Sequence, residues 1–391
     1  MRKKIACVVQ RYGLEVNGGA EYHCRVLAEH LADYYEVDVF TSCAKGYRPW
    51  DNYYKTGVEV INEVNVHRFA VEGIRDAAKF GVLTKKMNSG DKSVEDEWIK
   101  EIGPYCPTLI EHLKENANQY EAVIFFTYVY YFTVTGLKLE LKNSILLPTA
   151  HDEPTIYFPI YADLFKRPKA ILYNSVEERE LLRSKFGTSG IKSRLTCVGI
   201  DIPEEKEYKM PKALEKYKDD YMIYVGRVTQ GKGFDELNKY FLKYKAQNAS
   251  NMKLIVVGKI DNGMTITHSD DIIFAGYVTE EEKTALIKNA RLLVMPSFYE
   301  SLSLVILESM AVKRPVLVNG KCEVLKGQCI RSNAGLYYEN YEEFEECLNY
   351  IVANKEAYEQ MCENGFAFVK ENYDWNLVTQ NVISLIEELQ E

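Results

Sequence analysis

The sequence predicts an α/β protein of two domains, each built on a doubly wound parallel sheet. Two observations support this fold class. The chain has 391 residues, more than a single hydrophobic core usually serves, and 47% of them are apolar, which is enough for two cores. Short apolar segments also alternate with segments of helical length as far as residue 338. Such alternation of strand and helix is typical of parallel sheets covered by helices on both faces.

Charge and hydropathy exclude several classes of protein. Acidic residues outnumber basic ones by 57 to 48, giving a formal charge of -9, whereas general nucleic-acid binders normally carry a basic excess. We therefore expect no nucleic-acid partner. No apolar run approaches the roughly 18 residues of a membrane span, and the N-terminus becomes polar too soon for a signal peptide. A cytoplasmic protein is expected.

The cysteines favour a reducing environment. None of them forms a Cys-x-x-Cys pair, and several lie in apolar strand or helix patterns. Buried reduced thiols are therefore favoured over disulfides or a metal site. The nine positions are Cys7, Cys24, Cys43, Cys106, Cys197, Cys322, Cys329, Cys347 and Cys362.

The first domain opens with a strand, a glycine loop and a helix. Residues 4–9 form an apolar strand, Asn17, Gly18 and Gly19 interrupt the pattern, and a helix is expected over residues 21–34. A second strand follows at 36–40. The arrangement resembles the opening of a dinucleotide-binding domain, but Gly-x-Gly-x-x-Gly is missing, so a plain turn is an equal alternative.

Residues 72–107 are the least regular part of the sequence, and loops with short helices are expected there. A long loop in an N-terminal domain is often functional, and here it indicates recognition of a second substrate, the acceptor of a transferred group. Lys79, Lys85, Lys86 and Lys92 are scattered through it. These cations either contact an anionic lipid surface or a lipid-linked phosphate, or they form a solvated face.

His151 is a candidate site residue at the end of a strand. Strands are predicted at 122–127 and 144–148, and the second runs into His151, Asp152 and Glu153. A histidine after a strand, followed by carboxylates, is well placed for a cleft, whereas a core or capping histidine is the alternative.

The end of the first domain is marked by a strand, a capped helix and a hinge. A strand at 169–174 precedes Ser175 and Glu178, which match a capping box, and the helix runs toward Phe186. A further strand is expected at 195–198. We place the domain boundary after residue 200, before a charged stretch.

The second domain begins with a loop that can hold a diphosphate. A strand at 221–225 runs into Gly226 and Arg227, Lys232 follows, and a helix starts at Phe234. Two cations that bracket a glycine-bearing loop at a helix N-terminus bind phosphates without a metal. An exposed basic turn is the alternative, and the missing Gly-Lys-Ser/Thr ending excludes a Walker A loop.

Glu300 and Glu308 form the strongest motif of the chain. Residues 292–295 form a strand, 303–313 a helix and 315–318 another strand. Glu300 lies in the loop, whereas Glu308 lies within the helix among apolar residues, where an ionised carboxylate is costly unless a hydroxyl or a cation binds it. The backbone N–H groups of residues 301–305 would face an anion, for which phosphate is the obvious candidate.

The remaining elements continue the same alternation. Strands are expected at 253–257 and 272–278, and Thr279 with Glu282 forms a capping box at the next helix. A helical pair covers 341–368, and an amphipathic helix over 377–389 ends the chain.

Together these motifs resemble the retaining glycosyltransferases of family 4, the "glycosyl transferases group 1" of bacterial polysaccharide and glycoconjugate synthesis. The shared features are Glu-x7-Glu at 300–308, Gly-Arg and Lys-Gly at 226–233, His-Asp-Glu-Pro at 151–154, Gly-Gly-Ala-Glu at 18–21 and Gly-Ile-Asp at 199–201. Ser301-Leu302-Ser303 replaces the Gly-Phe-Gly of many members. The resemblance implies the GT-B fold, in which two Rossmann-like domains face a central cleft. The domains would be residues 1–200, with helix 376–391 packed back on them, and 201–375.

The resemblance also implies site residues and partners. The catalytic residues would be His151, Arg227, Lys232 and Glu300. The donor-binding residues would be Gly18, Gly19, Gly226, Tyr277, Val278, Leu304, Val305 and Glu308. No metal and no cofactor would be needed beyond a nucleotide-diphosphate sugar as co-substrate, and the acceptor would be a glycan, a lipid-linked molecule or another acceptor, with peripheral contact to the inner membrane surface as a further expectation. Two alternatives stay open: a nucleotide-sugar epimerase of the same architecture and a non-catalytic nucleotide-sugar-binding subunit.

Overall fold

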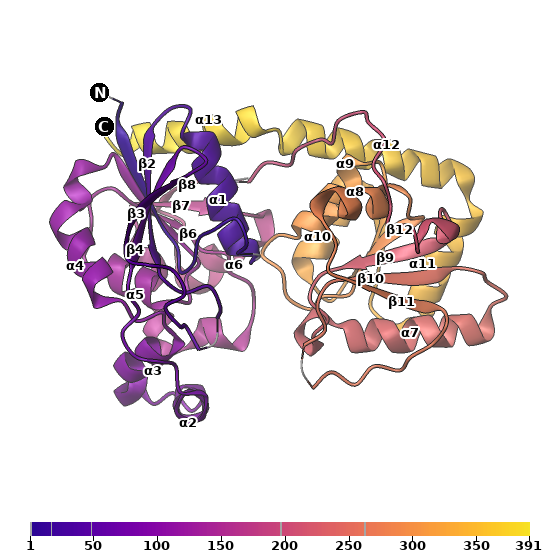
Figure 1. The fold of residues 1–391 in the computed structure, drawn as a ribbon, viewed down its shortest axis with the longest axis horizontal. Helices are drawn as coiled ribbons and strands as arrows, with labels where there is room; N and C mark the ends of the chain where they lie inside the picture. Colours follow the sequence, from indigo (N-terminus) through magenta and orange to yellow (C-terminus); the bar gives the residue numbers. More distant parts are fainter. Residues whose placement is uncertain (1, 17, 48, 196–197, 262) are drawn as a thin grey trace. The chain divides into compact units, whose positions relative to one another are not determined.

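A computed structural model describes residues 2–16, 18–47, 49–195, 198–261 and 263–391. The chain forms two compact units (Figure 1). Unit 1 comprises Met1–Gly199 and Trp375–Glu391, and unit 2 comprises Ile200–Asp374. Each predicted boundary lies one residue further along the chain than the corresponding boundary between the units.

Unit 1 is built on an eight-stranded sheet in the order β3-β4-β2-β1-β5-β6-β7-β8. All neighbours run parallel except the hairpin of β3 and β4, which forms one edge. The sheet order reverses direction between β1 and β5, so the carboxyl ends of these two strands define the switch point where such sheets bind ligands. The strands are β1 (Lys4–Val8), β2 (Glu36–Ser42), β3 (Gly57–Ile61), β4 (Val64–Phe69), β5 (Ala122–Phe126), β6 (Ser144–Leu147), β7 (Ala170–Tyr173) and β8 (Lys192–Leu195).

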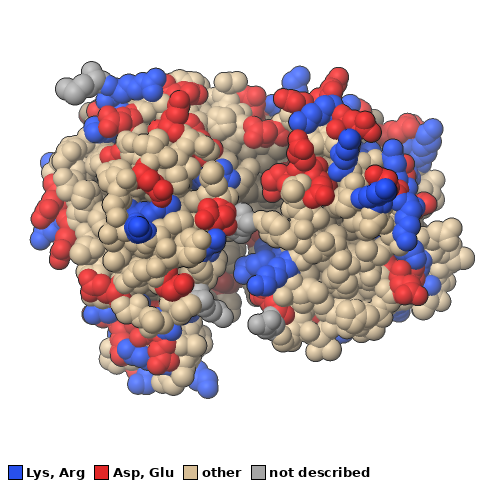
Figure 2. Space-filling model, viewed as in Figure 1, with Lys and Arg blue, Asp and Glu red and all other residues tan. Residues whose placement is uncertain are grey.

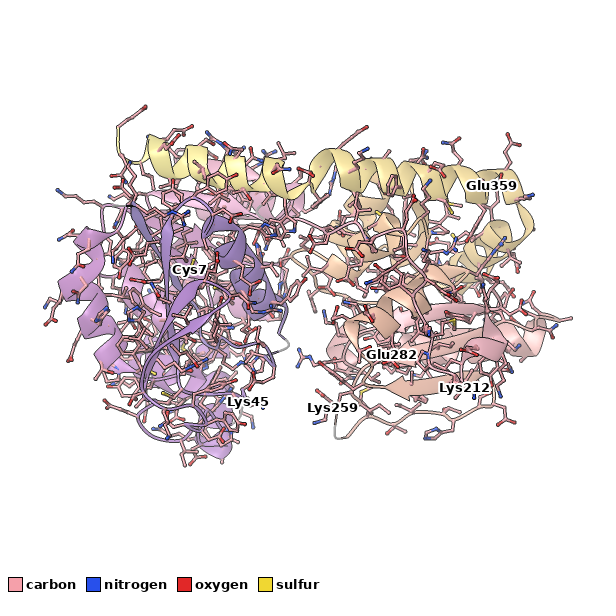
Figure 3. The ribbon with its side chains drawn as sticks, turned by 45° about the horizontal axis from the view of Figure 1, so that its top comes forward. Cys7, Lys45, Lys212, Lys259, Glu282 and Glu359 are labelled. Carbon is pink, nitrogen blue, oxygen red and sulfur yellow. The ribbon has the colours of Figure 1, made fainter. Side chains whose placement is uncertain are left out.

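Helices cover both faces of this sheet because alternate strand residues point to opposite sides. In β1, Ile5 and Cys7 belong to one buried cluster with α1 and α13, whereas Ala6 and Val8 belong to another with α2 to α6. Figure 3 shows Cys7 within unit 1. The helices are α1 (Gly19–Leu31), α2 (Ala77–Asn88), α3 (Glu95–Ile102), α4 (Pro107–Asn116), α5 (Tyr131–Leu137), α6 (Val176–Phe186) and α13 (Trp375–Glu388).

The last helix, α13, belongs to unit 1 although the chain reaches it from unit 2. Its Val382, Leu385 and Ile386 are buried with the core residues of α1. Trp375 stacks on the ring of His30 with 3.8 Å between ring centroids. A Cβ at Gly199 would lie 2.4 Å from the Trp375 ring, so glycine is required there for the two chain segments to pack together.

Unit 2 is built on a six-stranded, wholly parallel sheet in the order β11-β10-β9-β12-β13-β14. The order reverses between β9 and β12, so the loops that follow these two strands flank the switch point. The strands are β9 (Tyr221–Val225), β10 (Lys253–Val257), β11 (Ile272–Gly276), β12 (Leu292–Met295), β13 (Val316–Asn319) and β14 (Gly335–Tyr338).

The helices of unit 2 also cover both faces. Met222 and Tyr224 of β9 are buried with α7 and α11, whereas Tyr221 and Ile223 are buried with α8, α9 and α10. Figure 1 shows α7 on one side of the sheet and α8 and α9 on the other. The helices are α7 (Phe234–Gln247), α8 (Glu280–Lys288), α9 (Leu304–Ala311), α10 (Glu323–Ser332), α11 (Tyr341–Ala353) and α12 (Lys355–Asn372).

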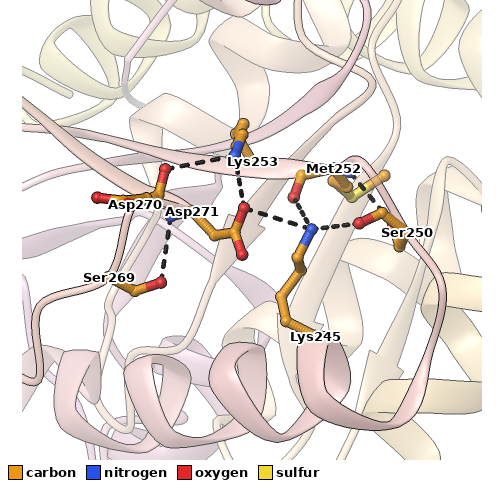
Figure 4. Close-up of polar contacts among 7 residues, drawn as sticks. All are labelled: Lys245, Ser250, Met252, Lys253, Ser269, Asp270 and Asp271. Carbon is orange, nitrogen blue, oxygen red and sulfur yellow. Dashed lines mark hydrogen bonds and ion pairs between the residues drawn. The ribbon is translucent and has the colours of Figure 1, made fainter.

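Ion pairs link the segments at the amino-terminal edge of the sheet of unit 2. Asp271, just before β11, lies 2.5 Å from the ammonium of Lys253 and 3.4 Å from that of Lys245 at the end of α7 (Figure 4). Burial acts to raise the pKa of Asp271, but the two lysines bring it below its usual value. Because ligands bind at the opposite edge of a parallel sheet, we interpret this cluster as structural.

Residues 72–107 contain the helices α2 and α3 among loops, which fits the loops and short helices expected there. Two other sequence predictions differ from the structure. β8 spans Lys192–Leu195, so the strand begins three residues before the predicted 195–198. Residues 196–197, including Cys197, lie outside the described residues, as does Asn17. Ser175 caps α6 by accepting from the Glu178 N–H, but the Glu178 carboxylate binds elsewhere, so the capping box is incomplete.

The described cysteines are free thiols, and all except Cys347 are buried, as predicted. Figure 2 shows acidic and basic side chains interspersed over the visible face of each unit. No helix of the described ranges is both long and apolar enough to cross a bilayer.

Candidate active site

The candidate site of unit 2 lies where the loops after β9 and β12 meet. Gly233, between the first loop and α7, adopts φ +67°, and a Cβ there would lie 2.1 Å from the Pro296 carbonyl oxygen of the second loop. A second close approach joins Gly226 to Gly258, which follows β10. A Cβ at Gly258 would lie 2.0 Å from the Gly226 carbonyl oxygen. Glycine therefore allows three backbone segments to converge at the carboxyl edge of the sheet.

The cations of the first loop differ in their contacts. Lys232 ends a short 3₁₀ turn, Gln230–Lys232, whose N-terminus is capped by the Thr229 hydroxyl. Its ammonium donates to Glu300 Oε1 at 2.6 Å, and the Glu300 side chain is only 12% exposed. Arg227 is exposed, and its guanidinium has no hydrogen bond or ion pair with any residue that the structure describes. One cation is thus held in place and the other faces solvent.

Lys259 belongs to the same edge. Figure 3 labels it in the loop that follows β10, where its carbonyl oxygen accepts from the Val228 N–H at 2.9 Å. This bond fixes the backbone beside Arg227.

The N-terminus of α9 opens toward this edge as well. Ser303 stands at the N-cap position but its side chain makes no capping hydrogen bond. The first N–H groups of α9, among them those of Leu304 and Val305, lack partners inside a helix by geometry, so they are donors available to an anion. The two side chains are half-buried against the core of unit 2.

Glu308 occupies the second turn of α9 and is paired with a lysine. The ammonium of Lys283 on α8 donates to Glu308 Oε1 at 3.1 Å and lies 3.0 Å from Oε2. Oε2 is nevertheless buried and accepts no hydrogen bond from the described residues. The expected need of this carboxylate for a cation is met by Lys283, and one oxygen remains for a ligand.

The segment after β11 presents Tyr277 to solvent. Its side chain is 76% exposed, while Val278 packs partly against the core beneath α8. Thr279 and Glu282 form the predicted capping box at the start of α8, and Figure 3 labels Glu282. Contact of the backbone around Tyr277 and Val278 with the donor nucleotide stays a prediction.

In unit 1, the glycine loop after β1 is shaped by a buried ion pair. Glu21 accepts from Arg11 at 2.6 Å and from the Tyr47 hydroxyl at 3.0 Å. A Cβ at Gly18 would lie 2.0 Å from Glu21 Oε2, whereas a Cβ at Gly19 would meet nothing within 4 Å. Gly18 is therefore required by the fold of the loop, and Gly19 leaves the surface open.

His151 lies in the loop that follows β6. Its Nε2 is 3.5 Å from Glu153 Oε2, and Glu153 also accepts from the Tyr128 hydroxyl at 2.9 Å. Burial acts to raise the pKa of Glu153, but the hydrogen bonds from His151 and Tyr128 bring it below its usual value. The carboxylate therefore orients the imidazole at the carboxyl edge of the sheet of unit 1.

Glu178 supports this loop from below. The fully buried carboxylate accepts from the Ala150 N–H at 2.5 Å and from the Asn174 N–H at 2.6 Å. It thereby joins the chain after β6 to the chain after β7, beside His151. Burial raises the pKa of Glu178 to about 8, although the two backbone donors lower it.

This raised pKa predicts a pH-dependent stability of unit 1. Because the folded state holds the proton of Glu178 more tightly than the unfolded chain, stability is greatest below about pH 4.5 and falls as the pH rises toward about 8. Glu178→Gln should remove this part of the slope, which is on the order of a few kcal/mol. Urea unfolding between these pH values, followed by tryptophan fluorescence, measures it, since Trp50, Trp98 and Trp375 all lie in unit 1. An unchanged slope in the variant would contradict the prediction.

A cavity of 200 Å³ lies in unit 1 where acceptor recognition was expected. Trp50, Glu72, Arg75, Lys100 and Tyr105 are among its lining residues. Lys79, at the rim, bridges Glu97 and Glu101 at 2.8 and 2.9 Å. The cavity therefore offers both signs of charge beside an aromatic wall.

The structure groups the predicted residues within each unit. Gly226, Arg227, Lys232 and Glu300 come together in unit 2 with the start of α9, and His151 and the glycine loop share the carboxyl edge of unit 1. The sequence did not predict three contacts: those of Glu21 with Arg11 and Tyr47, those of Glu178 with the Ala150 and Asn174 N–H groups, and that of Lys283 with Glu308. Lys283 had a usable signal, since it stands one turn before the buried Leu286 and Ile287, on the apolar face of α8. Among the described residues, no group of three or more His, Cys, Asp or Glu side chains could hold a metal ion.

Comparisons with known proteins agree with this arrangement. Residues 205–368 match the sequence model of the family glycosyl transferases group 1. The uncharacterized glycosyltransferase MJ1607 of Methanocaldococcus jannaschii is 24% identical, over 98% of this chain and 97% of that protein. Sucrose-phosphate synthase from Thermosynechococcus elongatus is similar in structure, with a TM-score of 0.73 and 18% identity over 99% of both chains. The structure of Anabaena Alr3699/HepE in complex with UDP and glucose is also similar, with a TM-score of 0.70 and 15% identity. That similarity covers 99% of this chain and 100% of the other.

The structural similarities define the fold. The chain has the GT-B fold, with two Rossmann-like units on parallel sheets, as predicted. Residues 205–368, most of unit 2, are similar in sequence to the glycosyl transferases group 1, the family that the sequence motifs resemble. Family 4, the retaining mechanism and the roles of the individual residues stay predictions.

Proposed function

We propose that the protein is a retaining glycosyltransferase of the family 4 type, which transfers a sugar from a nucleotide-diphosphate sugar to a glycan, lipid-linked or other acceptor in polysaccharide or glycoconjugate synthesis. The observation that carries the proposal is the meeting of Arg227, Lys232 and Glu300 with the uncapped N-terminus of α9 at the switch point of unit 2. A diphosphate needs cations and N–H donors, and a sugar needs a carboxylate. The site offers all three.

The leaving group sets the chemical demand on this site. As the bond between the anomeric carbon and the phosphate oxygen breaks, negative charge gathers on the nucleoside diphosphate. Arg227, Lys232 and the first N–H groups of α9 are fixed donors that stabilise this charge. Glu300 accepts hydrogen bonds from the transferred sugar and, in the free protein, holds Lys232 in place.

Retention follows from attack on the face that the phosphate leaves. The acceptor hydroxyl oxygen forms the new bond to the anomeric carbon on that same face, and its proton passes to the departing phosphate oxygen. His151, oriented by Glu153, would bind the donor sugar near the reaction centre. The Gly18 and Gly19 loop would cover the donor phosphates.

Unit 1 supplies the acceptor side in this proposal. In the cavity, the partly exposed ring of Tyr105 can stack on a sugar ring, while Arg75 and Lys100 can bind an anionic group of the acceptor. A lipid-linked acceptor would bring the protein into peripheral contact with the inner membrane surface.

Incubation with UDP-, ADP- and GDP-sugars, without any acceptor and followed by NMR, tests the function. Slow release of free nucleotide, from transfer of the sugar to water, is expected for a glycosyltransferase. The similar structure of Alr3699/HepE was solved with UDP and glucose, so UDP-glucose is the first probe. The appearance of an epimer would instead support the epimerase, and the absence of any reaction with bound nucleotide would support a binding subunit.

Transfer should not need a divalent metal. Arg227 and Lys232 supply the positive charge at the diphosphate, and the sequence contains no Asp-x-Asp, the motif with which metal-dependent sugar transferases hold their cation. We expect EDTA to change the rate of nucleotide release less than about twofold, within the error of such assays. Loss of activity in EDTA, with recovery on adding Mn²⁺ or Mg²⁺, would overturn the metal-free site.

A further inference from the structure

Lys283 is the least expected charged residue of unit 2. It stands in the first turn of α8, one turn before the buried Leu286 and Ile287, and its side chain is only 18% exposed. Burying a lysine is costly unless carboxylates surround the ammonium. Two of them do so: Glu308 on α9 and Glu280 on α8, the latter at 2.6 Å. Burial acts to lower the pKa of Lys283, but these carboxylates raise it overall, so the ammonium stays charged.

The carboxylates of Glu280 and Glu308 differ in their exposure to solvent. The Glu280 side chain is 82% exposed, so water screens its contribution. The Glu308 side chain is 26% exposed, and its Oε2 is buried without a hydrogen bond from the described residues. Lys283 donates to the other oxygen, Oε1, at 3.1 Å, and its ammonium also lies 3.0 Å from Oε2. The lysine thus fixes the orientation of the whole Glu308 carboxylate, while Oε2 accepts no hydrogen bond from the described residues.

An unsatisfied buried carboxylate oxygen is costly, and a ligand hydroxyl would relieve that cost. The N-terminus of α9, where the proposed diphosphate binds, lies one turn before Glu308 on the same helix. A hydroxyl beside a bound diphosphate belongs to the ribose of a nucleotide. Oε2 is therefore in place to accept a hydrogen bond from a ribose hydroxyl while Lys283 fixes the orientation of the carboxylate.

We propose that Lys283 is a positioning residue for the ribose site. It holds the Glu308 carboxylate in the orientation in which Oε2 accepts a ribose hydroxyl, and it thereby sets the preference of the protein for ribonucleotides. This inference rests on the proposed function, because it assumes that the ligand of unit 2 is a nucleoside diphosphate.

Calorimetry with UDP, ADP and GDP, and with the 2′,3′-dideoxy analogue of each, tests the proposal. The wild-type protein should bind at least one ribonucleotide about tenfold or more tightly than its dideoxy analogue. Lys283→Met should weaken binding of that ribonucleotide about tenfold and reduce the preference to within about threefold. A general disturbance of unit 2 would weaken both ligands equally, so the ratio isolates the positioning role. Lys283→Gln keeps a hydrogen-bond donor without the charge, so its ribonucleotide preference should lie between those of the wild type and Lys283→Met. It replaces Lys283→Met in the test if that variant does not fold.

Lys288→Met is the matched control, because Lys288 ends the same helix but is exposed and has no ion pair with a described residue. It should keep the wild-type preference. If the wild-type protein prefers the ribonucleotide and Lys283→Met keeps that preference, the positioning role is wrong and the proposed function stands. If the wild-type protein binds without a ribose preference, the ribose site is wrong. If it binds none of the nucleotides, both proposals are wrong.

Discussion

Lys232→Ala should lower the rate of sugar transfer by about 100-fold or more while unit 2 keeps its fold. In the proposed function its ammonium is a fixed donor at the position where the departing diphosphate gathers charge, and removing one such donor costs about 3 to 4 kcal/mol of transition-state stabilisation. The side chain is 31% exposed, and its hydrogen bond to Glu300 is the one polar contact that it makes with the described part of the chain. Little packing is therefore lost with it.

The measurement is the initial rate of nucleotide release or transfer at saturating donor, with circular dichroism to check the fold. Lys326→Ala is a matched control, because Lys326 also pairs with a glutamate, Glu339, at 2.9 Å, but on α10 and at the surface. It should leave the rate unchanged. A loss of similar size in both variants, or a normal rate in Lys232→Ala, would remove Lys232 from the reaction.

The sequence predicted the elements of unit 2 well, because a parallel sheet buried on both faces produces apolar runs bounded by glycine, proline and capping residues. Strands β9, β10 and β12 and the start of α7 lie where the sequence placed them. The order of the strands was not predictable in this way, because no local pattern states that β9 lies between β10 and β12. That order is what brings Lys232 to Glu300.

The parts that sequence reasoning missed depend on contacts between distant segments. Glu178 looked like the second half of a capping box, but its carboxylate binds the N–H groups of Ala150 and Asn174 instead, which only the neighbouring positions of β6 and β7 explain. The need of Glu308 for a cation was predictable from its apolar neighbours, whereas the identity of the cation was not. Lys283 lies 25 residues earlier, on another helix.

Neutralising Glu300 and neutralising Glu308 should affect nucleotide binding differently. Glu308→Gln should weaken binding of the nucleoside diphosphate by about 1 to 3 kcal/mol, since a buried charged hydrogen bond to the ribose is lost. Glu300→Gln should not weaken it. In the free protein Glu300 holds the ammonium of Lys232 at 2.6 Å, and a bound diphosphate must compete for that ammonium. Neutralising Glu300 removes the competitor, so affinity for the product nucleotide should stay the same or rise by a few-fold.

Transfer should nevertheless fall about 100-fold or more in Glu300→Gln, because in the proposed function the carboxylate acts mainly on the sugar in the transition state. Calorimetry with the nucleoside diphosphate and rate measurements on both variants give the two numbers that decide this. Because Glu300 is mostly buried beside Lys232, the isosteric glutamine keeps its packing, and circular dichroism verifies that it does. If Glu300→Gln weakens nucleotide binding as much as Glu308→Gln does, Glu300 serves the nucleotide rather than the sugar, and the division of roles along the motif is wrong.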